Sequence, residues 1–284
     1  MGASKGARKW VLAAVLVVLF AVGRHLWKLY GEWSENRPSL ADLRLHDGWM
    51  SLCLVTSAFA QVCFGFFWVC LLRQLGVRAG RESLLRAYAI GTLGKYVPGK
   101  ALVVVLRTTL APANGTSRLH IAFTIFYETL AGMGFGALIG CACMVLVQPK
   151  PYAIVIAGGG AGAAMLIVLH PAFFGRLVGL ALRPFRGRTV PAAARLPGFP
   201  FARGPAWLLG GWLLNGLSLL AAVRGMGVAD VGANDLALMT GASALASSLG
   251  FVAVFMPAGL GVRELILVHY WRPDWALRRP SSPR

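Results

Sequence analysis

The residues of this chain best suited to chemistry lie at two breaks in otherwise apolar sequence, one in each half. The first break, GKYVPGK at 94–100, is followed about two turns later by Arg107. The second break, FMPAGLGVRE, spans 255–264. In each break a proline ends or kinks the helix, glycines permit unusual backbone angles, and charged residues accompany them.

Interrupted hydrophobic segments in corresponding positions are typical of transporter binding sites, because the ends of half-helices aim their dipoles at the substrate. Basic side chains there would bind phosphate oxygens, arginine in bidentate fashion and lysine as a point charge. The alternative interpretation is that both breaks are loops at the membrane surface with interfacial Lys and Arg.

A carboxylate within an apolar run adds to this pattern. Glu128 lies in the sequence FYET, where an unpaired charge at the bilayer centre would cost on the order of 2.5 kcal/mol or more. We expect it to face the interior and to pair with a cation, the available ones being Lys95, Lys100, Arg107 and Arg263. The alternative is a Glu near a helix end that reaches water.

The adjacent residues Arg263 and Glu264 would point about 100° apart on a helix, so each needs its own partner. If Glu128 and Glu264 hold the basic groups of the two breaks, they form a charged core that could receive an anionic headgroup. The predicted substrate-binding residues are Lys95, Pro98, Gly99, Lys100, Arg107, Glu128, Pro257, Gly259, Gly261, Arg263 and Glu264.

The composition places these residues in a membrane. Of the 284 residues, 57% are hydrophobic and 13% are charged, and the mean hydropathy is +0.66, outside the range of soluble domains. The net charge of +18 comes from arginines between apolar runs, which is typical of membrane topology and lipid contact rather than of nucleic-acid binding. The five cysteines lie in apolar runs without a CxxC pair, so we expect buried thiols, no metal and no cofactor.

Apolar runs of about 20 residues predict the membrane spans. The first follows a basic start and lacks a signal-peptide cleavage site, so we expect it to be uncleaved. A basic segment at about 176–203, rich in Pro and Gly, is predicted to be a cytoplasmic linker. The predicted spans are 10–30, 48–72, 119–147, 152–174, 205–223 and 236–255.

The interrupted segment 84–111 must cross the membrane an even number of times if the N-terminus and the arginine clusters are cytoplasmic. A re-entrant pair of half-helices satisfies this requirement. It also implies a cavity, because lipid cannot form hydrogen bonds with the free backbone N–H and C=O groups where the helix is interrupted. We therefore predict an all-α, polytopic membrane bundle of one domain, 1–284, with about six to seven spans and re-entrant half-helices at both breaks.

At the two breaks the sequence resembles the lysylphosphatidylglycerol synthase transmembrane-region family, also described as the flippase-like domain. The resemblance rests on 94–100 with Arg107, on Glu128, and above all on PAGLGVRE at 257–264. The spans agree in order, so it covers most of the chain. It implies a helical bundle with re-entrant elements in the cytoplasmic membrane of a prokaryote. Relatives move aminoacylated phosphatidylglycerol or other phospho- or polyprenyl-linked lipids between leaflets.

The chain departs from the family after the Arg-Glu motif, where relatives continue into a further hydrophobic helix. Here 265–271 is too short to span, and a basic, proline-rich tail follows at 272–284. We expect a chain that is either truncated or altered at its end. Some relatives carry a fused aminoacyl-transferase domain, but this chain lacks the length for one, so we do not expect it to aminoacylate lipids.

These features predict a lipid flippase-like transporter in the cytoplasmic membrane whose partners are anionic lipids. Neither a nucleotide-binding loop nor an acidic metal-binding pair is present in the sequence, so we do not expect an enzyme. Two alternatives stay open: a membrane-embedded transferase with Glu128 or Glu264 as general base, and an assembly factor in envelope lipid or polysaccharide synthesis. A homo-oligomer and a complex with envelope-biosynthesis enzymes are also open.

Overall fold

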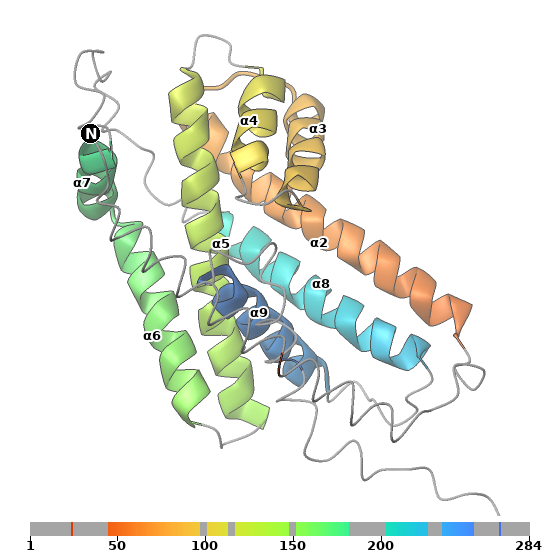
Figure 1. Cartoon of the computed structure of the whole chain (residues 1–284). Helices are drawn as coiled ribbons and strands as arrows, with labels where there is room; N and C mark the ends of the chain where they lie inside the picture. Colours follow the sequence, from red (N-terminus) through yellow and green to blue (C-terminus); the bar gives the residue numbers. More distant parts are fainter. Residues whose placement is uncertain are drawn as a thin grey trace, which may run out of the picture.

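A computed structural model describes residues 24, 45–96, 101–112, 117–147, 152–181, 203–226, 235–252 and 267. All regular elements within these ranges are helical (Figure 1). They are α2 (Asp47–Gln74), α3 (Arg81–Thr92), the 3-10 helix η2 (Leu93–Tyr96), α4 (Ala101–Leu110), α5 (Arg118–Val147), α6 (Tyr152–Val168), α7 (Pro171–Ala181), α8 (Gly204–Gly225) and α9 (Leu236–Val252). The predicted first span apart from Arg24, the second break and the tail at 272–284 lie outside the described residues.

Three of the described helices, α2, α5 and α8, are long and apolar enough to cross a membrane. At 1.5 Å per residue they extend roughly 42, 45 and 33 Å, against about 30 Å of hydrocarbon. Shorter apolar helices lie within α6 and α9. These helices confirm the predicted all-α membrane bundle, whereas the number of about six to seven spans stays a prediction.

The C-terminal end of α2 shows how local sequence sets a boundary. Gly76 has a φ of 80°, a left-handed conformation that glycine adopts at little cost. The N–H of Gly76 donates to the carbonyl of Arg73 at 3.0 Å, and the N–H of Val77 donates to that of Leu72 at 3.1 Å. This is a Schellman motif, and it turns the chain back toward α3.

The segment between α2 and α5 forms a helical hairpin, the arrangement predicted for a re-entrant pair. Helices α3 and α4 are about 18 and 15 Å long, so neither can span the membrane alone. Figure 1 shows them side by side, with the start of α3 and the end of α4 at the end of the bundle where α2 ends and α5 begins. The chain thus returns to the end of the bundle from which it left, as an even number of crossings requires, and the crossing of the membrane stays a prediction. Residues 97–100, between η2 and α4, lie outside the described residues.

The predicted span at 152–174 is wrong as a continuous helix. Helix α6 ends at Val168, and α7 begins at Pro171. Proline cannot donate the backbone hydrogen bond that would continue α6, and it disfavours a helical backbone at His170, so it begins a new helix instead. Because α7 continues to Ala181, the predicted linker at 176–203 is also wrong in its first residues.

Glycines and small polar groups bring the central helices together. The indole of Trp212, on α8, packs where a Cβ of Gly136 on α5 would be, and its Nε1 donates to the carbonyl of Gly132 at 3.1 Å. From α9, the hydroxyl of Ser248 donates to the carbonyl of Met133 at 2.9 Å. Helix α5 is therefore the element against which α8, α9 and the hairpin are all positioned.

Candidate functional site

An ion pair between α4 and α5 is the centre of the candidate site. Arg107 Nη1 lies 2.7 Å from Glu128 Oε2, and the two side chains are only 5% and 12% exposed. The prediction that Glu128 turns inward and pairs with a cation is confirmed, and Arg107 is that cation. The alternative in which Glu128 reaches water from a helix end is wrong.

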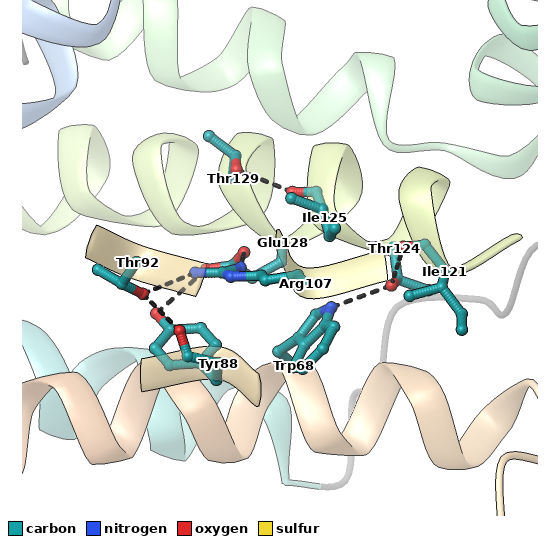
Figure 2. A network of polar contacts seen from close by, with 9 residues as sticks. All are labelled: Trp68, Tyr88, Thr92, Arg107, Ile121, Thr124, Ile125, Glu128 and Thr129. Atoms are coloured by element: carbon teal, nitrogen blue, oxygen red, sulfur yellow. Dashed lines mark hydrogen bonds and ion pairs between the residues drawn. The ribbon is translucent and has the colours of Figure 1, made fainter. Parts of the chain in front are cut away.

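Helix α3 supplies polar partners to both charged groups (Figure 2). Arg107 Nη2 donates to Thr92 Oγ1 at 3.0 Å, and the Thr92 hydroxyl in turn donates to the carbonyl of Tyr88 at 2.8 Å. The Tyr88 hydroxyl donates to Glu128 Oε1 at 3.4 Å. Both carboxylate oxygens of Glu128 are thus engaged, one by each arm of the hairpin.

Two aromatic rings enclose the guanidinium. Arg107 Cζ lies 4.0 Å from the centroid of the Tyr88 ring and 5.4 Å from that of the Trp68 ring, both within the range of cation–π attraction. Trp68 is on α2, and its Nε1 donates to Thr124 Oγ1 on α5 at 3.0 Å. Four helices therefore contribute to one cluster, which we call the Arg107 cage: Trp68, Tyr88, Thr92, Arg107 and Glu128.

Sequence reasoning missed Trp68, Tyr88 and Thr92. Tyr88 and Thr92 are four residues apart and so share a face of α3, but this spacing is common in buried helices. Trp68 lies in an aromatic-rich run where nothing local distinguishes it from a core residue. Their roles follow from the packing of α2 and α3 on α4, which the sequence does not state.

Two glycines let the arms of the hairpin pack this closely. At Gly91 a Cβ would overlap Arg107 Cγ, and at Gly94 it would lie 2.7 Å from the backbone nitrogen of Val103. The expectation that glycines of the first break permit unusual backbone angles is wrong for Gly94, because Gly76 is the only described glycine with a positive φ. What Gly94 permits is close approach of η2 to α4.

The arrangement is closed and electrically balanced. Arg107 as a whole is 4% exposed, and its charge is neutralised by Glu128. Breaking a buried pair by removing one partner typically costs about 3–5 kcal/mol, since it leaves an uncompensated charge. Chemically, the cluster fixes the hairpin to α5 and α2, and an external ion can reach Arg107 only if these elements separate.

The other predicted site residues are only partly covered by the described structure. Lys95 lies in η2 and is half-buried. The predicted residues outside the described ranges are Pro98, Gly99, Lys100, Pro257, Gly259, Gly261, Arg263 and Glu264. Their assignment to substrate binding stays a prediction, as does the charged core that would join Glu128 to Glu264. Within the described ranges no group of three or more His, Cys, Asp or Glu could hold a metal ion.

Comparison with known proteins identifies the family. No curated protein and no solved structure matches the chain. The sequence profile of one family, described as the lysylphosphatidylglycerol synthase TM region, matches residues 9–273. This match includes both breaks and every described helix, and it confirms the resemblance seen at PAGLGVRE. The chain therefore belongs to the lysylphosphatidylglycerol synthase transmembrane-region family.

Proposed function

We propose that this protein moves a phospholipid of the lysylphosphatidylglycerol type, or a polyprenyl-linked glycolipid, between the leaflets of the cytoplasmic membrane. The family links the chain to the synthesis or flipping of membrane lipids. The anionic phosphate is one part of the headgroup that the protein would bind, while the tails stay in the bilayer. The N-terminus is proposed to be cytoplasmic.

The observation that carries this proposal is the re-entrant hairpin of α3, η2 and α4, fixed by a buried ion pair. An interruption of a helix at membrane depth is tolerated where protein or a water-filled cavity covers the exposed backbone groups. Transporters use such elements to bind substrates near the midplane. Intramembrane charges are costly, so those that persist commonly mark a substrate pathway.

The contacts of Arg107 suggest how the headgroup would be admitted. In the closed arrangement the guanidinium binds Glu128 Oε2 and Thr92 Oγ1. Separation of α4 from α5 would release it, and a phosphate could then replace the carboxylate, because arginine binds both groups with the same fork geometry. Lys95, on the same hairpin, would add a second positive charge.

Leaflet exchange in liposomes tests the proposal. Purified protein is reconstituted with a fluorescent phosphatidylglycerol, and a membrane-impermeant quencher reports the fraction that reaches the outer leaflet with time. We expect faster exchange than in empty liposomes, and a loss of roughly tenfold or more in the Lys100→Ala and Glu264→Gln variants, the size expected when a charged contact worth about 1.4 kcal/mol or more is lost. Arg86→Ala, at an exposed arginine of α3, is the matched control and should exchange like the parent.

Two results would contradict the proposal. The first is an active parent whose exchange rate is unchanged in both charged variants, since the breaks would then have no part in transport. The second is a change in the chemical structure of the labelled lipid, measured by mass spectrometry on the same liposomes. That change would favour the transferase.

A further inference from the structure

The four side chains around the Arg107 guanidinium form a cage suited to an organic cation. Glu128 supplies a carboxylate oxygen at 2.7 Å and Thr92 a hydroxyl oxygen at 3.0 Å. The rings of Tyr88 and Trp68 lie 4.0 and 5.4 Å from the central carbon. Aromatic rings combined with a carboxylate are the chemistry by which proteins recognise ammonium and guanidinium groups.

The walls of the cage and its occupant belong to different helices (Figure 2). Trp68 is on α2, Tyr88 and Thr92 are on α3, and Glu128 is on α5. Trp68 is held by its hydrogen bond to Thr124, and Thr124 donates to the carbonyl of Ile121 at 2.7 Å. None of these bonds involves α4, so the walls have contacts that do not depend on Arg107.

Arg107 occupies the cage, but not all of its hydrogen-bond donors have an acceptor there. Its Nη1 and Nη2 have acceptors, but its Nε is buried and lacks any hydrogen-bond partner. A buried donor without an acceptor is a free-energy cost that folded proteins usually avoid. An alkylammonium occupant would avoid this cost because its stem carries no N–H, whereas an alkylguanidinium would share it with Arg107.

The path of the Arg107 stem leads into the cage past Gly91. A Cβ at position 91 would overlap Arg107 Cγ and would approach its Cδ at 3.3 Å. The absence of a side chain at Gly91 therefore leaves room for an alkyl chain that ends in a cationic group. A ligand with such a chain could follow the same path once the stem of Arg107 is withdrawn.

We infer that Trp68, Tyr88, Thr92 and Glu128 form a binding site for a monovalent organic cation, a guanidinium or alkylammonium group, of which Arg107 is the exchangeable resident occupant. This inference deepens the proposed function and rests on it only for the natural ligand, which would be the cationic part of a lipid headgroup. A free cation from water has the same chemistry, and the experiment distinguishes the two sources. Its readout is binding, so its failure and a failure of leaflet exchange are distinguishable.

The test measures thermal unfolding of the detergent-solubilised full chain during titration with methylguanidinium, which is soluble, or with dodecylguanidinium, which partitions into micelles. Sodium chloride at equal ionic strength is the control. A ligand that binds only the folded state raises Tm in a saturable way. In Arg107→Ala we expect such a rise. In the parent we expect the same rise at concentrations at least about tenfold higher, because the tethered arginine competes at a high effective concentration.

The Arg107→Ala/Glu128→Gln variant should lose the effect, since the carboxylate is the anionic wall. The parent and Trp68→Leu provide a second comparison that does not require Arg107→Ala to fold. Trp68→Leu removes one aromatic wall without changing charge, and it should bind more weakly than the parent. An effect of dodecylguanidinium alone assigns the ligand to the membrane, and an effect of methylguanidinium assigns it to water.

Three results would overturn the inference. One is a folded Arg107→Ala protein whose Tm does not respond to either cation. Another is a response that persists after Glu128→Gln. The third is a parent protein that does not respond at any concentration, which would make Arg107 a permanent structural residue and not an exchangeable occupant.

Discussion

The backbone of Gly91 on α3 lies against the side-chain stem of Arg107 on α4, with no space between them for a β-carbon. The two residues are in separate arms of the hairpin, so their contact sets how closely the arms pack. The guanidinium at the end of this stem then reaches Glu128 on α5. A small change at position 91 should therefore affect an ion pair to which Gly91 contributes no atom.

Gly91→Ala should destabilise the protein by about 1–3 kcal/mol, the usual cost of overpacking a buried site. The Arg107 stem would have to shift, and its guanidinium would move away from Glu128. Thermal unfolding in detergent measures the effect. Gly132→Ala, in α5, is the matched control because a Cβ there meets no atom within 4 Å. It should be neutral or stabilising, since alanine favours a helix over glycine by about 1 kcal/mol. Equal effects at both positions would contradict the role of Gly91.

Removing one member of the Arg107–Glu128 pair should cost more than removing both. Arg107→Met and Glu128→Met should each destabilise by about 3–5 kcal/mol, because each leaves a buried charge without its partner. The double variant has no such charge, and an apolar replacement of a buried pair is often neutral. A double-mutant cycle of unfolding free energies measures the coupling. Additive effects of the two substitutions would show that the charges do not interact.

Two buried threonines should respond in opposite directions to the same substitution. Thr240 is fully buried and its hydroxyl lacks a partner, whereas the Thr124 hydroxyl accepts from Trp68 and donates to the carbonyl of Ile121. Valine has nearly the same shape without the hydroxyl. Thr240→Val should be neutral or stabilise by up to about 1 kcal/mol, and Thr124→Val should destabilise by about 1–3 kcal/mol. The difference in Tm between the variants checks both signs, and destabilisation by Thr240→Val would refute the first.

Adjacent phenylalanines of α7 test how that helix is held. Phe174 is 5% exposed and packs edge-on against Tyr127 at a centroid distance of 5.4 Å, whereas Phe173 is 48% exposed. Phe174→Ala should cost about 3–5 kcal/mol through the cavity it leaves. Phe173→Ala should change the unfolding free energy by about 0.5 kcal/mol or less, as at other exposed positions. Similar losses in the two variants would mean that α7 does not pack through Phe174.

A re-entrant hairpin predicts that the start of α3 and the start of α5 are accessible from the same side of the membrane. In a background without the five native cysteines, Glu82→Cys and Ser117→Cys should react with a membrane-impermeant maleimide from the same side of the membrane. Val147→Cys, at the other end of α5, should react from the opposite side. Labelling of positions 82 and 117 from opposite sides would mean that the segment between α2 and α5 is a through-span.

The sequence was informative where a residue type carries a large energetic penalty. The cost of a lone carboxylate in an apolar run predicted that Glu128 would be paired. The requirement that the arginine clusters lie on the same side of the membrane predicted the hairpin. The choice of Arg107 among four cations depends on how far the arms of the hairpin approach each other, which Gly91 and Gly94 decide through tertiary contacts. The sequence does not indicate which residue either glycine contacts.

The helix break before Pro171 was missed for a different reason. The run at 152–174 is apolar apart from His170, and hydrophobicity alone does not distinguish one helix from two short ones in succession. The proline was the available signal, because it removes a backbone donor and restricts His170. Trp68 carries no comparable signal, since an aromatic residue in a membrane helix can face lipid, core or a cation equally well.

Helix α5 places Tyr127 and Glu128 at neighbouring positions, which point about 100° apart. Tyr127 packs with Leu169 and Phe174, on either side of the break between α6 and α7, whereas Glu128 faces the hairpin. One turn of α5 therefore contacts both the hairpin and the residues that flank the junction of α6 and α7. A rotation of α5 that withdrew Glu128 from Arg107 would also displace Tyr127 against Phe174, so the hairpin and the α6–α7 junction are mechanically coupled through a single helical turn.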